Sequence, residues 1–387
     1  MFLLRLLLKN AFRHRLRALL TLVGLVVAIS AFGLLRTIVD AWYAGVDATS
    51  STRLITRNAI SLTFPLPLGY AQRIRAVDGV SGISWANWFG GIYITERNFF
   101  AQFAVDPPSY LALYPEFVLS DAEKQAFFRD RQGCVVGRKL AAKFGWKVGD
   151  NVALRGTIYP GTWTFTIRGI YHGKDAKTDE QQMFIHWQRL AEQIRARTAG
   201  SGQADYVGVY VVGIHHPDEA PLVAQRIDAL FHNSLAETLT ETEKAFQLSF
   251  VSMSEAILVA VQAVSLIIIL IIMAVMANTM TMTARERLAE YATLKALGFS
   301  PGFVSRLLLG ESLMIALVGG AIGMAVTFPL ARAFVQAAGT LFPIFHVSAL
   351  TIALQLAASL VVGLVAAAWP AWKMSRIDII QGLRHVA

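Results

Sequence analysis

The sequence predicts a membrane protein with four transmembrane helices and one large mixed α/β domain between the first and second helices. Of the 387 residues, 55% are hydrophobic and 16% are charged, which fits neither an ordinary soluble protein nor a bundle wholly buried in lipid. Long uncharged runs lie near the N-terminus and in the last third of the chain. Residues 36–255 hold 22 basic and 22 acidic residues and are therefore neutral. The surplus basic residues that give the net charge of +9 lie beside the uncharged runs. This distribution indicates membrane topology and argues against a nucleic-acid partner.

The N-terminus is basic and then apolar. Residues 1–17 contain five Lys/Arg and no acid, interleaved with leucine and phenylalanine, which predicts a cytoplasmic amphipathic helix on the membrane surface. Residues 18–39 are predicted to form transmembrane helix 1. A cleaved signal peptide is the competing interpretation, but the apolar run is long and no small-x-small cleavage site precedes the polar region.

Residues 40–250 are predicted to form a periplasmic α/β domain, because segments with strand composition alternate with segments of helical periodicity. A strand ends at Asp106-Pro107-Pro108, which is interpreted as a stop. Cys134, the single cysteine, is expected to be a small buried residue. No metal site is expected, since the adjacent His215 and His216 point to opposite faces of a strand. The expected strands lie in 79–95, 98–105, 134–136, 151–155, 163–171, 183–187 and 206–214, and the expected helices in 70–77, 121–131, 135–144, 188–197 and 218–233.

A long stalk helix is predicted after this domain. Residues 222–297 contain no glycine or proline, and 256–284 contain no charge. A helix over 243–284 would be about 60 Å long, twice the ~30 Å core of a bilayer. Residues 251–284 are therefore assigned to the stalk and transmembrane helix 2. Polar residues near the inner end are expected to hydrogen-bond to neighbouring helices; they are Asn278, Thr279, Thr281 and Thr283.

Two further spans complete the predicted topology. Residues 312–331 and 349–372 are uncharged and rich in small residues, and a short periplasmic loop, 332–348, joins them. The segments predicted to be cytoplasmic are 1–17, the loop 285–311 and the tail 373–387. They contain 5, 4 and 3 Lys/Arg, against one in the short outer loop. The positive-inside bias thus predicts an inner-membrane protein with both termini in the cytoplasm.

The loop 285–311 shows helical spacing of Leu288, Tyr291, Leu294 and Leu297. Gly298 can end this short helix in a left-handed conformation, and a proline at 301 can begin the next one. The helix is expected either to lie on lipid or to dock a cytoplasmic partner, and the spacing leaves both open.

The segment EYATLKALGFSPGFVSRLLLGESLMIALVGGAIGM (residues 290–324) resembles the signature of the MacB/FtsX/LolC-type ABC transporter permeases. Tyr291 departs from the usual Ile or Val. Residues 11–30, 135–156 and 165–171 resemble the family's first span and its periplasmic core domain. Residues 369–385 resemble its C-terminal tail, with departures at Ser375, Ile379, Gln381 and Gly382. The positions that match the signature are Glu290, Leu294, Lys295, Ala296, Gly298, Glu311, Gly319, Gly320 and Gly323.

The resemblance implies a non-catalytic permease subunit that works as a dimer, with itself or a homologous permease, on a separate pair of cytoplasmic ATPase subunits. The chain has no G-x-x-x-x-G-K-[ST] phosphate loop, so ATP and Mg are expected on the partner, and no cofactor or metal is expected on this chain. The family's coupling helix corresponds here to Arg287, Glu290, Tyr291, Leu294, Lys295, Leu297, Gly298 and Pro301. Helix packing is expected of Glu311, Gly319, Gly320 and Gly323.

By resemblance, the permease exports or extracts envelope cargo by mechanotransmission, the cargo being a lipid, lipoprotein, peptide or hydrophobic drug. The alternative is an FtsX-like regulator that switches a periplasmic enzyme without transport. Membrane lipid is an expected neighbour, while a periplasmic adaptor and an outer-membrane channel stay open. Aromatic residues of the α/β domain are expected in its core, with a cargo surface as the alternative; they are Trp85, Trp88, Phe89, Tyr93, Phe99, Phe100 and Phe103.

Overall fold

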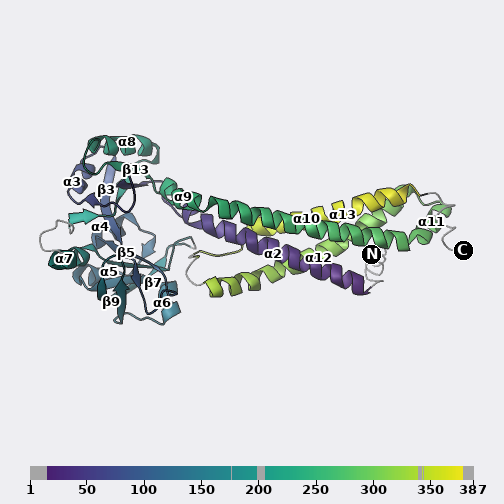
Figure 1. The fold of residues 1–387 in the computed structure, drawn as a ribbon, viewed down its shortest axis with the longest axis horizontal. Coiled ribbons are helices and arrows are strands. Elements are labelled where there is room, and N and C mark those ends of the chain that lie inside the picture. Colours follow the sequence, from purple (N-terminus) through teal and green to yellow (C-terminus); the bar gives the residue numbers. More distant parts are fainter. Residues whose placement is uncertain (1–14, 176, 198–204, 339–341, 343, 378–387) are drawn as a thin grey trace. The chain divides into compact units, whose positions relative to one another are not determined.

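The computed structural model describes residues 15–377 except 176, 198–204, 339–341 and 343 (Figure 1). The chain divides into a helical unit, residues 1–41, 254–337 and 345–387, and an α/β unit, residues 42–253 and 338–344. Among the described residues, four helices are long and apolar enough to cross a membrane, and the α/β unit comes between the first and the second in the chain. This confirms the predicted fold class. Most of the predicted surface helix 1–17 and of the tail 373–387 lies outside the described residues.

The four long helices do not coincide with the predicted uncharged spans. They are α2 (Arg15–Asp47), α10 (Glu255–Glu286), α12 (Pro301–Ala338) and α13 (Ala349–Ser375). The span predicted at 312–331 is the middle of α12, so the helix includes parts of both predicted flanking loops. The physical reason is that absence of charge marks the segment suited to hydrocarbon, whereas a helix continues into polar surroundings as long as its backbone stays hydrogen-bonded.

The predicted continuous stalk is interrupted at Ser254. Helix α9 (Glu243–Met253) ends there and α10 begins at the next residue. The backbone of Ser254, with φ −106° and ψ 8°, leaves the helical conformation, and the boundary between the two units falls between Met253 and Ser254. Freedom from glycine and proline therefore did not guarantee one helix. The same stretch also contains a strand, β13 (Thr238–Thr242), that the sequence did not predict.

Glycines bring α12 close to its neighbours in the helical unit. A Cβ atom at Gly319 would lie 2.8 Å from Leu25 Cβ, and one at Gly323 would lie 2.9 Å from Ile29 Cβ, both on α2. A Cβ at Gly320 would collide with Ser359 of α13. In lipid, where apolar surface gains little from burial against another helix, such close approach supplies much of the association energy.

We expect Gly323→Ala to lower the thermal stability of the purified protein, because the added Cβ overlaps Ile29 and overpacking costs about 1–3 kcal/mol. Gly302→Ala, the matched control on the same helix, has space, since the nearest heavy atom to its added Cβ is Arg306 Nη2 at 4.0 Å. Melting followed by tryptophan fluorescence in detergent measures both. Equal melting temperatures for the two variants would contradict the predicted contact.

Polar side chains also join the helices, and one that the sequence predicted takes part: Thr21 Oγ1 of α2 donates to Thr279 Oγ1 of α10 (3.4 Å). Gln355 of α13, fully buried, donates from Nε2 to Ile29 O (2.9 Å) and to Thr327 Oγ1 (2.8 Å), and so links α2, α12 and α13. Thr281 and Thr283 instead donate to carbonyls four residues earlier in their own helix. The expected interhelical bonding is therefore wrong for these two threonines, because a helical threonine can always reach its own i−4 carbonyl.

In the described part of the α/β unit, eleven strands form one mixed sheet with the order β13-β1-β12-β3-β5-β10-β7-β9-β8-β4, in which β6 pairs with β9. A second sheet contains β2 (Leu66–Pro67) and β11 (Tyr206–Val207). The other strands are β1 (Arg53–Asn58), β3 (Val80–Trp88), β4 (Gly91–Ile92), β5 (Ala101–Val105), β6 (Phe117–Val118), β7 (Gly133–Gly137), β8 (Asn151–Gly156), β9 (Gly161–Gly173), β10 (Gln182–His186) and β12 (Val209–Ile214).

Helices cover both faces of this sheet. Residues of α3, α6, α7 and α8 belong to one buried cluster, and residues of α4 and α5 belong to another. Strand β3 separates the two clusters, since Ile83 lies in the first and Ala86 in the second, as the alternation of a strand requires. The helices are α3 (Tyr70–Arg75), α4 (Pro107–Leu113), α5 (Asp121–Arg129), α6 (Arg138–Phe144), α7 (Trp187–Arg197) and α8 (Ala220–Leu230).

Three local predictions can be compared with these elements. The pair Pro107-Pro108 ends a strand but also begins α4, with Asp106 as its N-cap, because proline fits the first turn of a helix. Cys134 is fully buried, and burial raises the pKa of its thiol. The predicted aromatic group divides, since Phe89 and Phe100 are core residues whereas Trp88 and Phe99 remain exposed.

Candidate functional site

The candidate site is the short helix α11 (Leu288–Ala296), which follows α10 and precedes α12. Gly298, with φ +89°, lies just after its end. Its N–H donates to Lys295 O, and the next N–H, of Phe299, donates to Leu294 O. These two bonds form a Schellman motif, which satisfies the last carbonyls of the helix and turns the chain sharply into α12. The predicted glycine cap therefore sets where α11 ends.

Arg287 holds the beginning of α11 against α12. Its side chain is buried, and Nη1 lies 2.6 Å from the Glu311 carboxylate while Nε lies 2.9 Å from Glu290. Glu311 is only 1% exposed although it lies within α12. The guanidinium also lies 5.4 Å from the ring of Tyr291, a buried residue of α11 that packs in an apolar cluster. A buried charge requires such a partner, so α11 and α12 are tied at this point.

Lys295 holds the other end of α11 against α13. Its Nζ donates to the carbonyls of Ser375 (2.6 Å) and Ile377 (2.9 Å), at the C-terminus of α13. A cation there satisfies the unpaired carbonyls and complements the helix dipole. Between the two anchors, α11 covers a small apolar core shared with α10, α12 and α13, made of Ala284, Tyr291, Val304, Leu307, Leu308, Ala371 and Met374.

The predicted coupling residues thus separate into two groups. Arg287, Tyr291 and Lys295 face the protein and fix the helix, and Leu294 packs against the apolar core. Glu290 is exposed and pairs with Arg287. Leu297, Gly298 and Pro301 are exposed, as is Phe299, which the sequence did not single out. We call the exposed segment 297–301 the α11–α12 turn. Leu297 is 72% exposed, so an apolar side chain projects from the α11–α12 turn.

The predicted packing residues separate as well. Gly319, Gly320 and Gly323 lie at helix contacts, whereas Glu311 is the partner of Arg287 and so belongs to the anchoring of α11. A second ion pair at this end, between Arg17 of α2 and Glu286 of α10 (2.7 Å), was not predicted. No sequence signal pairs residues 269 positions apart.

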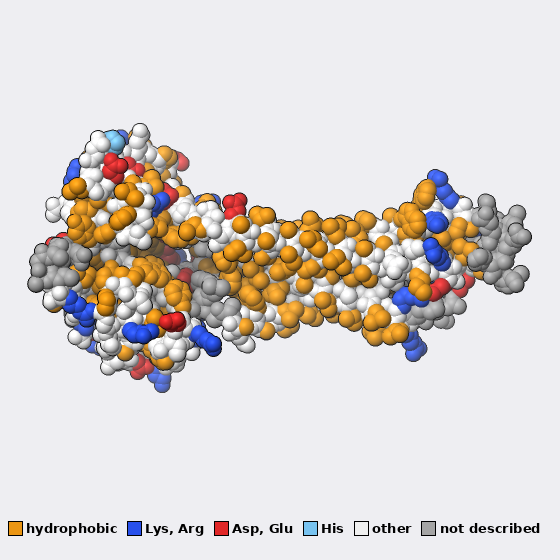
Figure 2. Space-filling model, in the orientation of Figure 1, with side chains coloured by type: hydrophobic (Ala, Val, Ile, Leu, Met, Phe, Trp, Pro, Cys, Tyr) orange, Lys and Arg blue, Asp and Glu red, His pale blue; other side chains and the backbone are white. Residues whose placement is uncertain are grey.

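The α11 end of the helical unit has the composition of a membrane interface. Figure 2 shows a broad hydrophobic surface on the long helices and basic side chains gathered beyond it. On α13 and just after it, Lys373 lies 5.1 Å from the ring of Trp369 and Arg376 lies 4.4 Å from that of Trp372. Both tryptophans are exposed. Exposed tryptophan beside Lys and Arg is typical of the boundary between hydrocarbon and water.

Comparisons with known proteins bear on both units. The FtsX-like permease C-terminal family matches residues 263–379, and the MacB-like periplasmic core domain family matches residues 18–230. An uncharacterised ABC transporter permease of Methanocaldococcus jannaschii is 23% identical over 403 residues, covering 97% of this chain and 96% of that protein. An uncharacterised ABC transporter permease of Mycobacterium tuberculosis is 25% identical over 207 residues. The match covers 53% of this chain but only 22% of the length of that protein.

Two solved structures resemble the chain in part. The extracellular domain of the ABC-type transporter YknZ from Gram-positive bacteria is 12% identical, with a TM-score of 0.35, covering 49% of this chain and 100% of that one. The periplasmic region of MacB from Actinobacillus actinomycetemcomitans is 10% identical, with a TM-score of 0.37, covering 53% of this chain and 95% of that one.

Proposed function

The chain belongs to the ABC transporter permease family, and on that premise we propose that it couples a separate cytoplasmic ATPase to movements of its α/β domain. The α11–α12 turn is the docking surface for that ATPase, and ATP and Mg act on the partner. The basic end of the helical unit faces the cytoplasm, as the positive-inside bias requires, and the α/β domain lies on the other side of the membrane.

The anchoring of α11 is the observation that supports this proposal. A force on the exposed turn reaches α12 through Arg287 and Glu311, and reaches α13 through Lys295. A helix lying loosely on lipid would have no need of buried ionic and carbonyl contacts at both of its ends. The arrangement therefore favours a partner-bound, load-bearing helix over the lipid-surface alternative.

Movement is passed to the α/β domain by the helices that lead into it. Helix α2 is uninterrupted from Arg15 to Asp47, about 50 Å at 1.5 Å per residue. The α9–α10 connection changes conformation at Ser254, so it is not one stiff rod. We propose that two copies, or this chain and a homologous permease, work together, and that the cargo is an envelope lipid, lipoprotein, peptide or hydrophobic drug.

We expect Leu297→Asp to reduce stimulation of the co-purifying ABC ATPase at least tenfold, because an exposed apolar anchor lost from an interface costs about 2 kcal/mol or more. The turn is exposed, so thermal stability should stay unchanged. Leu235→Asp is the matched control, since Leu235 is a fully exposed leucine of the α/β unit. Wild-type stimulation by Leu297→Asp would show that the α11–α12 turn does not contact the ATPase.

A further inference from the structure

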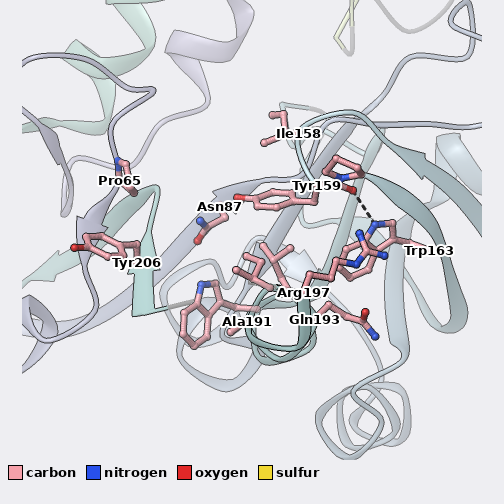
Figure 3. Close-up of a pocket in the computed structure, with 13 residues that line it drawn as sticks. Pro65, Asn87, Ile158, Tyr159, Trp163, Ala191, Gln193, Arg197 and Tyr206 are labelled. Carbon is pink, nitrogen blue, oxygen red and sulfur yellow. Dashed lines mark hydrogen bonds between the residues drawn. The ribbon is translucent and has the colours of Figure 1, made fainter. Parts of the chain in front are cut away.

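A cavity of about 490 Å³ lies within the α/β unit, between strand β3, helix α7 and the turn that joins β8 to β9 (Figure 3). This volume is in the range of small-molecule sites. Its wall is mainly aromatic and aliphatic, with Tyr159, Trp163, Trp187 and Tyr206 among the lining residues. Such a wall suits a flat apolar ligand, because aromatic rings stack on one another at little cost in side-chain freedom.

Asn87 contributes a buried polar side chain to this wall. Asn87 lies on β3, on the same face of the strand as the core residue Ile83. Its side chain is buried, and the residue is only 8% exposed. Within the part of the chain that the structure describes, its Oδ1 accepts no hydrogen bond, although its side-chain amide contacts the Tyr159 hydroxyl. A buried carbonyl oxygen without a hydrogen bond has lost its contact with water and gained nothing in return, which destabilises the fold. A ligand with an N–H or O–H group would supply that hydrogen bond on binding.

The lining of the cavity also carries a positive charge, from Arg197. Arg197, at the end of α7, lies beside Trp163 in Figure 3, with its guanidinium 5.6 Å from that ring. Gly161 makes the room for it, because a Cβ there would lie 2.5 Å from Arg197 Nη2. Among the described residues that line the cavity there is no acidic side chain. The cavity should therefore favour anions over cations.

From these features we propose that the α/β unit binds a small planar aromatic carboxylate that carries an N–H or O–H donor. The donor pairs with Asn87 Oδ1, the ring lies against the aromatic wall, and the carboxylate faces Arg197. The inference does not rest on coupling to an ATPase, since every residue that it uses belongs to the α/β unit.

The probe is 5-fluoroindole-3-acetate, whose binding to the full-length protein in detergent is followed by ¹⁹F NMR line broadening. Two analogues separate the contributions. The N-methyl derivative lacks the donor and should bind about tenfold more weakly, the ratio expected for one buried hydrogen bond of about 1.4 kcal/mol. 5-Fluorotryptamine reverses the charge and should not bind. Absence of saturable binding by the acetate at 1:1 stoichiometry would overturn the proposal.

Protein variants complete the test. Asn87→Leu should bind the acetate and its N-methyl derivative equally weakly, because the acceptor is gone. Arg197→Gln should weaken the acetate about tenfold. The matched control is Arg195→Gln, because Arg195 lies on the same helix but pairs with Asp205 at 2.6 Å and does not line the cavity. If Asn87→Leu unfolds, Arg197→Gln against Arg195→Gln decides alone. Equal affinity of those two variants for the acetate would refute the site.

Discussion

Arg287→Met is expected to lower the free energy of unfolding of the helical unit by about 3–5 kcal/mol, the usual effect of removing one partner from a buried ion pair. The substitution preserves most of the apolar stem and takes away the guanidinium that opposes the charge of Glu311, 2.6 Å away. Glu311 is almost completely buried, so water cannot substitute. Thermal melting in detergent, followed by tryptophan fluorescence, measures the loss.

Two further variants identify the cause. The double substitution Arg287→Met/Glu311→Leu should recover much of the stability, because two apolar side chains can replace a buried pair at little cost. The cycle of single and double variants isolates the interaction between the two residues. Arg285→Met is the control, since Arg285 is exposed and two positions away. If the double variant is no more stable than Arg287→Met, the unpaired charge on Glu311 does not cause the loss of stability.

The ends of α11 could be predicted from sequence because local chemistry sets them. Gly298 allows the left-handed conformation, and Pro301 begins the next helix, so a few neighbouring residues contain the whole signal. The direction of each charged side chain could not be predicted in this way. The sequence places Arg287 and Lys295 in the coupling helix but does not show their partners. These lie in α12 and at the end of α13, 24 and 80 or more residues later.

The same distinction explains the stalk and the sheet. Absence of charge predicted where α10 is apolar, but the helix is interrupted at Ser254, where neither glycine nor proline marks a break. Strand β1 has a polar sequence, Arg53 to Asn58, and was missed because its pairing with β12 and β13 joins segments more than 150 residues apart. The cavity around Asn87 was equally invisible, since one buried amide in a strand has no sequence signature.

The second large effect is expected at the start of α9, where Glu243 is buried in the α/β unit. Its carboxylate accepts from Arg53 Nε (2.8 Å), from Ser50 N (3.0 Å) and from the Tyr114 hydroxyl (3.1 Å). Arg53 is buried too and also pairs with Glu116 at 2.6 Å. Burial would lower the pKa of Arg53, but Glu243 and Glu116 raise it, so the guanidinium stays charged.

Glu243→Leu should therefore destabilise the α/β unit by about 3–5 kcal/mol, because it leaves three donors without their shared acceptor. Glu241→Leu is the matched control two residues earlier. Glu241 makes one partly exposed pair with Arg57 at 3.0 Å, and its loss should cost about 1 kcal/mol or less. Melting of the full chain compares the two variants.

The position of Glu243 gives this prediction a second, local readout. As the first residue of α9 it fixes that helix to β1, and α9 has no continuous helix beyond Ser254 to support it. Glu243→Gln keeps the shape and removes the charge, and it should speed amide hydrogen exchange in residues 243–253 more than in the sheet. Unchanged exchange in α9 would mean that apolar packing, and not the buried carboxylate, attaches this helix to the domain.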